Sequence, residues 1–227
     1  FSATGCQVYG DPKEPIHVGL PFKNASGTYY LGKGGGAIYL TVTGAVTVDG
    51  VIRADSSDGS WAENARASGA AGSVYIRAAS VSGTGSITAD GSNSNEQNNK
   101  GVGGRVAIVT ETPVDRGTFA AISAKVNTLN NSSKQATTFG GAGTVYFKDS
   151  TMTYGKLVVA EKSDRNGLSM DYINRYTFVG TDGDWTFDSV EIAKNSYLIV
   201  PAGTSLHLPA GLTSVTGTAT GTALGGI

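Results

Sequence analysis

Two aspartates occupy equivalent places in two copies of a short motif, where "VIRAD" ends in Asp55 and "SITAD" ends in Asp90. If the copies stack, the two carboxylates repel one another, and a bridging Ca²⁺ ion would relieve that repulsion. A carboxyl pair about 5–9 Å apart would also suit glycoside hydrolysis. However, Asp before Ser or Gly at the end of a strand is an ordinary turn residue. The third copy, "AISAK", has Lys125 at this place, so a salt-linked Asp90–Lys125 contact is equally economical. We favour the turn role and keep the calcium site and the catalytic pair as alternatives.

A second acidic group lies in "TDGDWTFD", where Asp182, Asp184 and Asp188 have the spacing of a calcium-binding loop. The segment lacks the glycine at the sixth position and the glutamate at the twelfth that an EF-hand loop needs. We therefore expect a turn followed by a strand on which Trp185 and Phe187 pack, with a Ca²⁺ site as the alternative.

The third candidate site is aromatic. Adjacent strands lie about 4.8 Å apart, which is near the length of one sugar ring, so a column of exposed aromatic rings would suit a polysaccharide. The candidates are three tyrosines and two flanking arginines: Tyr39, Tyr75, Tyr146, Arg77 and Arg105. Stacking of the tyrosines on each other, or their burial under a loop, explains the same column without any ligand. We favour this structural interpretation, since Ala107 interrupts the column.

Other reactive residue types are isolated. Cys6 is the only cysteine, which excludes an internal disulfide and any cysteine-based zinc site. His17 and His207 have no Ser/His/Asp or metal-ligand spacing around them. The sequence therefore predicts no required cofactor, with Ca²⁺ as the one ion that the aspartates would hold.

A repeat of about 35 residues must position these side chains. The isoleucines of the three motif copies, Ile52, Ile87 and Ile122, are each 35 residues apart. A small-residue pair precedes an alternating strand four times, in "AIYL" (37–40), "SVYI" (73–76), "RVAI" (105–108) and "TVYF" (144–147). Side chains alternate along a strand, so the aligned strands predict two inward columns. These columns are Ile38/Val74/Val106/Val145 and Leu40/Ile76/Ile108/Phe147, and the tyrosines point outward between them.

This pattern predicts an all-β fold, a right-handed parallel β-helix with about three strands per coil. The polar inserts 56–69 and 91–101 would leave one corner as long loops, and glycines would supply positive-φ corners. An antiparallel sandwich is the alternative, but it predicts hairpins between neighbours, without a 35-residue register.

We divide the chain into four parts by composition. Residues 1–30 are irregular and would cap the first coil, and 31–150 hold the glycine-rich repeats. In 151–210 shorter apolar runs predict more compact coils, and 211–227 is a Thr/Gly-rich linker or the end of a fragment.

Composition excludes several classes of function. The net charge is −1, so bulk electrostatics attract neither nucleic acid nor an anionic membrane. No apolar run approaches the roughly 18 residues of a membrane span. Few charges, 33 glycines and a single cysteine fit a bacterial extracellular or cell-surface protein.

The stretches "GKGGGAIYLTVTGAVTVDGVIRAD", "AAGSVYIRAASVSGTGSITADG" and "GVGGRVAIV" resemble the glycine-rich right-handed β-helix repeats of large secreted or surface-attached bacterial proteins. The resemblance implies an extracellular module embedded in a longer chain, in a superfamily that includes pectate-lyase-like enzymes and adhesin shafts. No catalytic motif of the enzymes can be matched to this sequence.

We therefore expect a non-catalytic stalk or adhesion scaffold. Its partners would be neighbouring domains of the same chain and a polysaccharide or a host or cell-surface glycan. A polysaccharide lyase or glycoside hydrolase acting along the outer face is the alternative from another class. Self-assembly through open solenoid ends into filaments is the third.

Overall fold

The structure is a computed structural model that describes residues 10–23, 30–57, 69–92, 101–125, 141–159, 176–180, 183–192, 196–200 and 203–209. These residues are all-β: they form seventeen strands in mostly parallel sheets, with one 3₁₀ turn, η1 (Arg116–Thr118), and no α-helix. Within them, no helix is long and apolar enough to cross a membrane.

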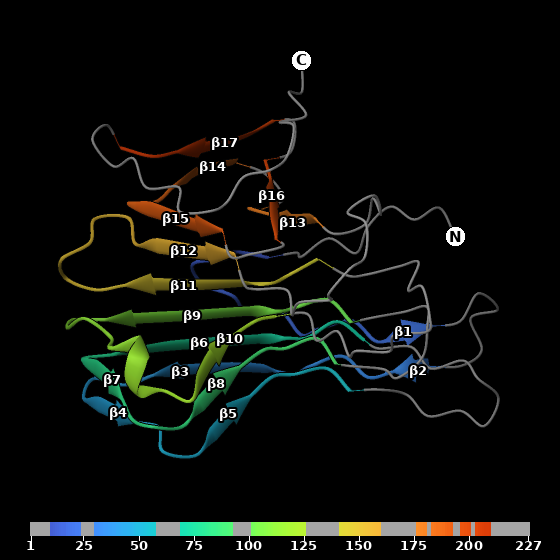
Figure 1. The fold of residues 1–227 in the computed structure, drawn as a ribbon, viewed down its shortest axis with the longest axis horizontal. Helices are drawn as coiled ribbons and strands as arrows, with labels where there is room; N and C mark the ends of the chain where they lie inside the picture. The colour runs from blue at the N-terminus through green and yellow to red at the C-terminus, as the bar shows by residue number, and fades with distance from the viewer. Residues whose placement is uncertain are drawn as a thin grey trace, which may run out of the picture.

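Three consecutive repeats supply the strands of the first half. The first contains β3 (Ala37–Thr41), β4 (Ala45–Thr47) and β5 (Val51–Arg53). The second contains β6 (Ser73–Ala78), β7 (Ser80–Ser82) and β8 (Ser86–Thr88), and the third contains β9 (Arg105–Thr110), η1 and β10 (Ala121–Ser123). Equivalent strands of successive repeats pair in parallel: β3 with β6 and β9, β4 with β7, and β5 with β8 and β10. Figure 1 shows these layers one above another, with the first repeat at the bottom.

The pairing confirms the predicted register. Ile52 aligns with Ile87, which aligns with Ile122. Along the longest sheet, the two predicted inward columns also align residue for residue, through β11 (Thr144–Lys148). Their side chains form one apolar core, in which the column residues of the second and third repeats are fully enclosed, whereas Ile38 and Leu40 of the first repeat are only half-buried.

The glycines directly before β6, β9 and β11 serve close packing. A Cβ on Gly72 would overlap the carbonyl oxygen of Gly36, and Gly104 and Gly143 meet the same obstacle from the preceding repeat. The glycines in the small-residue pairs before these strands have no positive φ, so the predicted role as positive-φ corners is wrong for them, whereas Gly83, between β7 and β8, has a φ of +133° and fits it. For the glycines before β6, β9 and β11, the physical reason is that backbone lies directly on backbone, leaving no volume for a side chain.

The second half departs from simple stacking. β12 (Lys156–Val159) pairs antiparallel with β11, through a turn in which Gly155 has a φ of +80°. β15 (Ser189–Ile192) then pairs in parallel with β12, which completes a six-stranded sheet in the order β15-β12-β11-β9-β6-β3. Nothing in the sequence pattern marked this reversal of direction. This reversal does not test the prediction that residues 151–210 form a separate part of the chain.

Three two-stranded sheets complete the described residues. β13 (Tyr176–Phe178) pairs in parallel with β16 (Tyr197–Ile199), and β14 (Gly183–Thr186) does so with β17 (Thr204–His207). β1 (Phe22–Lys23) and β2 (Tyr30–Gly32) are antiparallel.

The outer face of the six-stranded sheet carries a second apolar core. Its buried members come from the sheet and from segments near the C-terminal end: Tyr75, Ala107, Tyr146, Leu157, Val179, Phe187 and Val190. The face that the sequence predicts to be outward therefore has its own covering layer.

Candidate functional site

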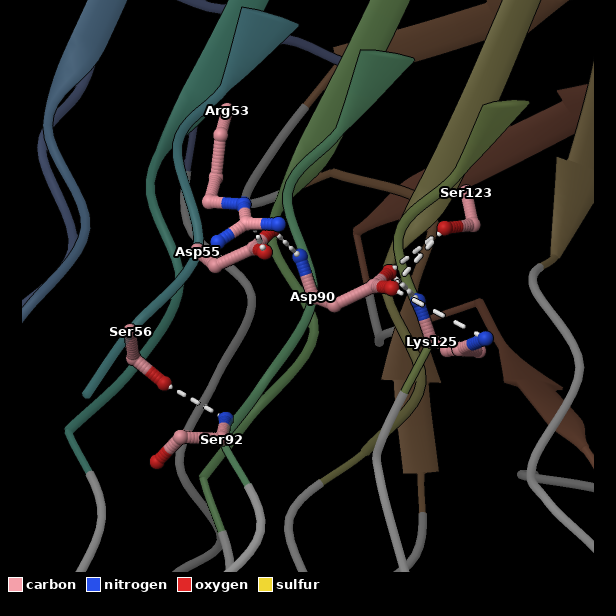
Figure 2. A network of polar contacts seen from close by, with 7 residues as sticks. All are labelled: Arg53, Asp55, Ser56, Asp90, Ser92, Ser123 and Lys125. Carbon is pink, nitrogen blue, oxygen red and sulfur yellow. Dashed lines mark hydrogen bonds and ion pairs between the residues drawn. The ribbon is translucent and has the colours of Figure 1, made fainter. Parts of the chain in front are cut away.

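The aspartates of the repeated motif accept hydrogen bonds from the backbone of the next repeat. The N–H of Asp90 donates to Asp55 Oδ1 at 2.6 Å, and the N–H of Lys125 donates to Asp90 Oδ1 at 2.8 Å. Figure 2 shows both side chains directed along the stack, from one repeat to its successor. Because both donors lie 35 residues after their acceptors, each carboxylate helps to hold the register between repeats.

Asp90 is the more enclosed of the two, with 8% of its surface exposed. The Ser123 hydroxyl donates to its carboxylate at 2.8 Å, and Lys125 Nζ lies 3.9 Å from Oδ2. The salt-linked contact that the sequence offered as an alternative is therefore present. Burial raises the pKa of Asp90, while the hydrogen bonds from Ser123 and the Lys125 N–H and the charge of Lys125 oppose that rise.

Asp55 is less enclosed and pairs with Arg53, whose Nε lies 3.2 Å from Oδ2. One residue further along, Ser56 Oγ accepts from the N–H of Ser92 at 2.7 Å (Figure 2). We call Asp55, Ser56, Asp90, Ser92, Ser123 and Lys125 the corner ladder. All its members are used in contacts between successive repeats.

Asp49 repeats this arrangement at another corner, a residue that the sequence reasoning missed. Its Oδ1 accepts from the N–H of Thr84 at 3.1 Å and from the Thr84 hydroxyl at 3.2 Å. The separation is again 35 residues, so the repeat length itself was the signal that would have found it.

In the part of the chain that is described, no group of three or more His, Cys, Asp or Glu is placed to hold a metal ion. Asp184 is exposed and lies 3.7 Å from His207 Nε2, while Asp182 and Cys6 fall outside the described residues.

The predicted tyrosine platform is not an open surface. Tyr39, Tyr75, Ala107 and Tyr146 are aligned across neighbouring strands as expected. However, Tyr75 is 5% exposed and Tyr146 is 2% exposed, because the second core covers them. Tyr39 alone among the three tyrosines is exposed, at 54%, and its ring stacks on Tyr75 with centroids 4.7 Å apart.

Tyr146 is held as a structural residue. Its hydroxyl donates to the carbonyl of Tyr154 at 2.8 Å, and its ring meets Phe187 edge-on with centroids 6.1 Å apart. Burial raises the pKa of the Tyr146 hydroxyl, which keeps it a neutral donor.

The two predicted arginines differ in environment. Arg77 is exposed, whereas Arg105 is 1% exposed and donates to the Thr144 hydroxyl at 3.1 Å. Burial lowers the pKa of Arg105 to about 10, so the guanidinium stays charged at neutral pH. A cavity of about 20 Å³ lies beside it, lined by His17, Val18 and residues 70–73 and 102–104. This volume suits a single water molecule and no sugar.

Residues 10–20 cross the outer face as a strap, which the sequence reasoning placed only as an irregular cap. The Tyr39 hydroxyl donates to Glu14 Oε1 at 2.6 Å, and the Ser73 hydroxyl donates to the carbonyl of His17 at 2.7 Å. Lys13 Nζ donates to the carbonyl of Thr186 at 2.8 Å and lies 4.8 Å from the centre of the Phe187 ring. The strap therefore ties the first repeat to the C-terminal segments.

No protein-family model, curated protein or solved structure matches this chain. The likeness to glycine-rich β-helix repeats therefore rests on residues of this chain alone.

Proposed function

We propose that this chain is a right-handed parallel β-helix and serves as a non-catalytic extracellular module, a stalk or adhesion scaffold within a bacterial surface or secreted protein. Parallel pairing of three strand sets from successive repeats supports this fold. Connections between parallel strands are right-handed in nearly all proteins, which sets the hand.

One observation carries the proposal: the polar groups of the repeats bind the backbone of the neighbouring coil. Asp49, Asp55 and Asp90 each accept a hydrogen bond from an N–H located 35 residues later. A carboxylate directed into the backbone of its own stack is unavailable to a substrate in a groove. It is well placed to resist shear between coils, as a stalk requires.

Adhesion would use what remains exposed of the aromatic column. Tyr39 presents more than half of its surface, next to the exposed Thr41 and Arg77. An aromatic ring beside a hydroxyl and a guanidinium suits a glycan, since the ring stacks on a sugar face while the others form hydrogen bonds.

The test is a glycan-array screen with wild type, Tyr39→Ala and the control Tyr154→Ala, each with and without a Ca²⁺ chelator. Tyr154 is 42% exposed and lies outside the column, so its variant controls for loss of any surface tyrosine. We expect the wild type to bind a glycan, with and without the chelator. Tyr39→Ala should lose this binding, and the control Tyr154→Ala should keep it. Binding that survives in Tyr39→Ala would exclude this ring as the contact.

The same proteins, together with Asp55→Asn and Asp90→Asn, should be assayed for polysaccharide cleavage, by the release of reducing ends for a hydrolase and by the ultraviolet absorbance of unsaturated products for a lyase. The scaffold proposal expects no turnover. Turnover by wild type that either Asn variant abolishes would establish the lyase or hydrolase alternative instead.

A further inference from the structure

We infer that the first repeat is a self-association surface, through which two copies of this chain meet end to end. The inference depends on how the repeats are stacked and is independent of stalk or adhesion function. A single segment, 37–53, supplies the terminal strand of three sheets. β3 ends the six-stranded sheet, β5 ends the three-stranded sheet, and β4 is one edge of the pair β4-β7 (Figure 1).

The backbone groups that face this end can be identified. The N–H of Val42 and the carbonyl of Gly36 bond to the second repeat, as do the N–H of Val48 and the carbonyl of Gly44. The carbonyl of Gly50 and the N–H of Ala54 do the same beside β5. Backbone groups point alternately to the two sides of a strand, so the intervening residues direct theirs toward the open end. These are Ala37, Tyr39, Thr41, Ala45, Thr47, Val51 and Arg53.

Among the described residues, the interior of the stack is also less covered here than in the second repeat. Ile38, Val46 and Ile52 are only half-buried, whereas their partners in the second repeat, Val74, Val81 and Ile87, are 0%, 4% and 0% exposed. Covering these side chains removes apolar surface from water, which favours association at about 25 cal/mol per Å².

The segment lacks three of the features that natural edge strands use against pairing, namely proline, lysine and a bulge, although β4 and β5 are only three residues long. It contains no Pro and no Lys, and its three strands pair without a bulge. Its charged side chains are Asp49 and Arg53, so two such ends carry no net charge against each other. The run "TVTGAVTVDGVI" has the β-branched, nearly uncharged composition of self-pairing segments.

These properties favour a second copy as the occupant, because the surface complements itself. We expect the two copies to be related by a two-fold axis that passes through the middle of the β3 face, perpendicular to the direction of stacking. This axis would pair β3 antiparallel with β3 of the other copy. It would also place β4 of each copy against β5 of the other, so that the two apolar interiors remain aligned. The terminal segment 37–53 has 17 residues, slightly fewer than the about 20–30 residues that each partner contributes to a standard interface.

The test is the mass of the full chain by light scattering and sedimentation, over a wide range of concentrations. We expect a dimer of twice 23.1 kDa that dissociates on dilution. Thr47→Pro should abolish it, because the Thr47 N–H faces the open end and the substitution removes no bond to the second repeat. Thr41→Lys/Thr47→Lys should abolish it by charge repulsion. The control Thr112→Lys/Ser150→Lys adds the same charge at exposed positions outside the first repeat and should still dimerise.

Three outcomes overturn the inference: a wild type that stays monomeric throughout, folded edge variants that dimerise as the wild type does, or assemblies that grow beyond two copies. If the edge variants fail to fold, hydrogen exchange of the wild type decides. Amides of 37–53 should exchange several-fold more slowly at high concentration than at low, and unchanged exchange there would refute the interface.

Discussion

Replacement of Asp90 by alanine tests the corner ladder directly. The change removes the acceptor of two hydrogen bonds, from the Ser123 hydroxyl and from the Lys125 N–H, and leaves those donors beside a cavity. Hydrogen bonds to a charged group contribute about 1.5–3 kcal/mol each, and the cost of keeping a buried carboxylate charged offsets part of that. We therefore expect the free energy of unfolding to fall by about 2–3 kcal/mol. For a chain of this size that corresponds to a melting temperature lower by roughly 5–10 °C.

Asp90→Asn is the matched control. The side-chain oxygen of the asparagine can still accept from the Lys125 N–H, and its amide group can donate to Ser123 Oγ. The substitution removes only the long ion pair with the Lys125 ammonium group, and that ion pair contributes less than about 1 kcal/mol. We expect this variant to lie within about 1 kcal/mol of wild type in urea unfolding at pH 7. If it is as unstable as the alanine variant, the negative charge itself is required. Stabilisation of the wild type by Ca²⁺ but not of Asp90→Asn would then restore the calcium alternative and refute the ladder as the role of Asp90.

The difference in stability between wild type and Asp90→Asn should change with pH in a defined direction. Burial raises the folded-state pKa of Asp90 above its reference value of 3.8, so between the two values the folded state binds more protons than the unfolded state. The contribution of Asp90 to stability is therefore greatest below pH 3.8 and decreases as pH rises through the folded-state pKa. We expect the stability of Asp90→Asn relative to wild type to be greater at pH 7 than at pH 3. The opposite trend would show that hydrogen bonds outweigh desolvation at this site.

Two further perturbations test the packing and the surface charges. Gly72→Ala should prevent the chain from accumulating as a soluble folded protein, since the added Cβ overlaps the backbone of Gly36. Gly44→Ala, which meets no atom within 4 Å, should melt at the wild-type temperature or slightly above, as followed by circular dichroism. Equal melting temperatures of Gly72→Ala and wild type would contradict the close-packing role of Gly72. For Glu191, the hydrogen bond from Lys156 (2.6 Å) lowers the carboxyl pKa below its reference value of 4.5, with Arg116 at 3.7 Å contributing. Its stabilisation, less than about 1 kcal/mol for so exposed a pair, is present above pH 4.5 and is lost as pH falls through the folded-state pKa. Glu191→Gln should therefore cost stability at pH 7 and none at pH 2.5, whereas a constant difference would point to packing.

The sequence by itself determined the stacking. The 35-residue interval predicted that Ile52, Ile87 and Ile122 align, and period-two alternation predicted which columns enter the core. The same interval placed Asp90 beside Lys125. These relations were readable because an identical local pattern recurs at a fixed offset, so one repeat specifies the neighbours of the next.

Only the tertiary structure decided what covers the stack. Lys13 reaches Thr186 across 173 residues, and the strap and the second core bury Tyr75 and Tyr146, although alternation alone assigns both to the outer surface. The tertiary structure alone also showed that β12 turns back and pairs antiparallel with β11. Alternation specifies which of two faces a side chain occupies but carries no information on whether that face meets water or another segment. That outcome depends on contacts between parts of the chain that share no repeat and no local pattern.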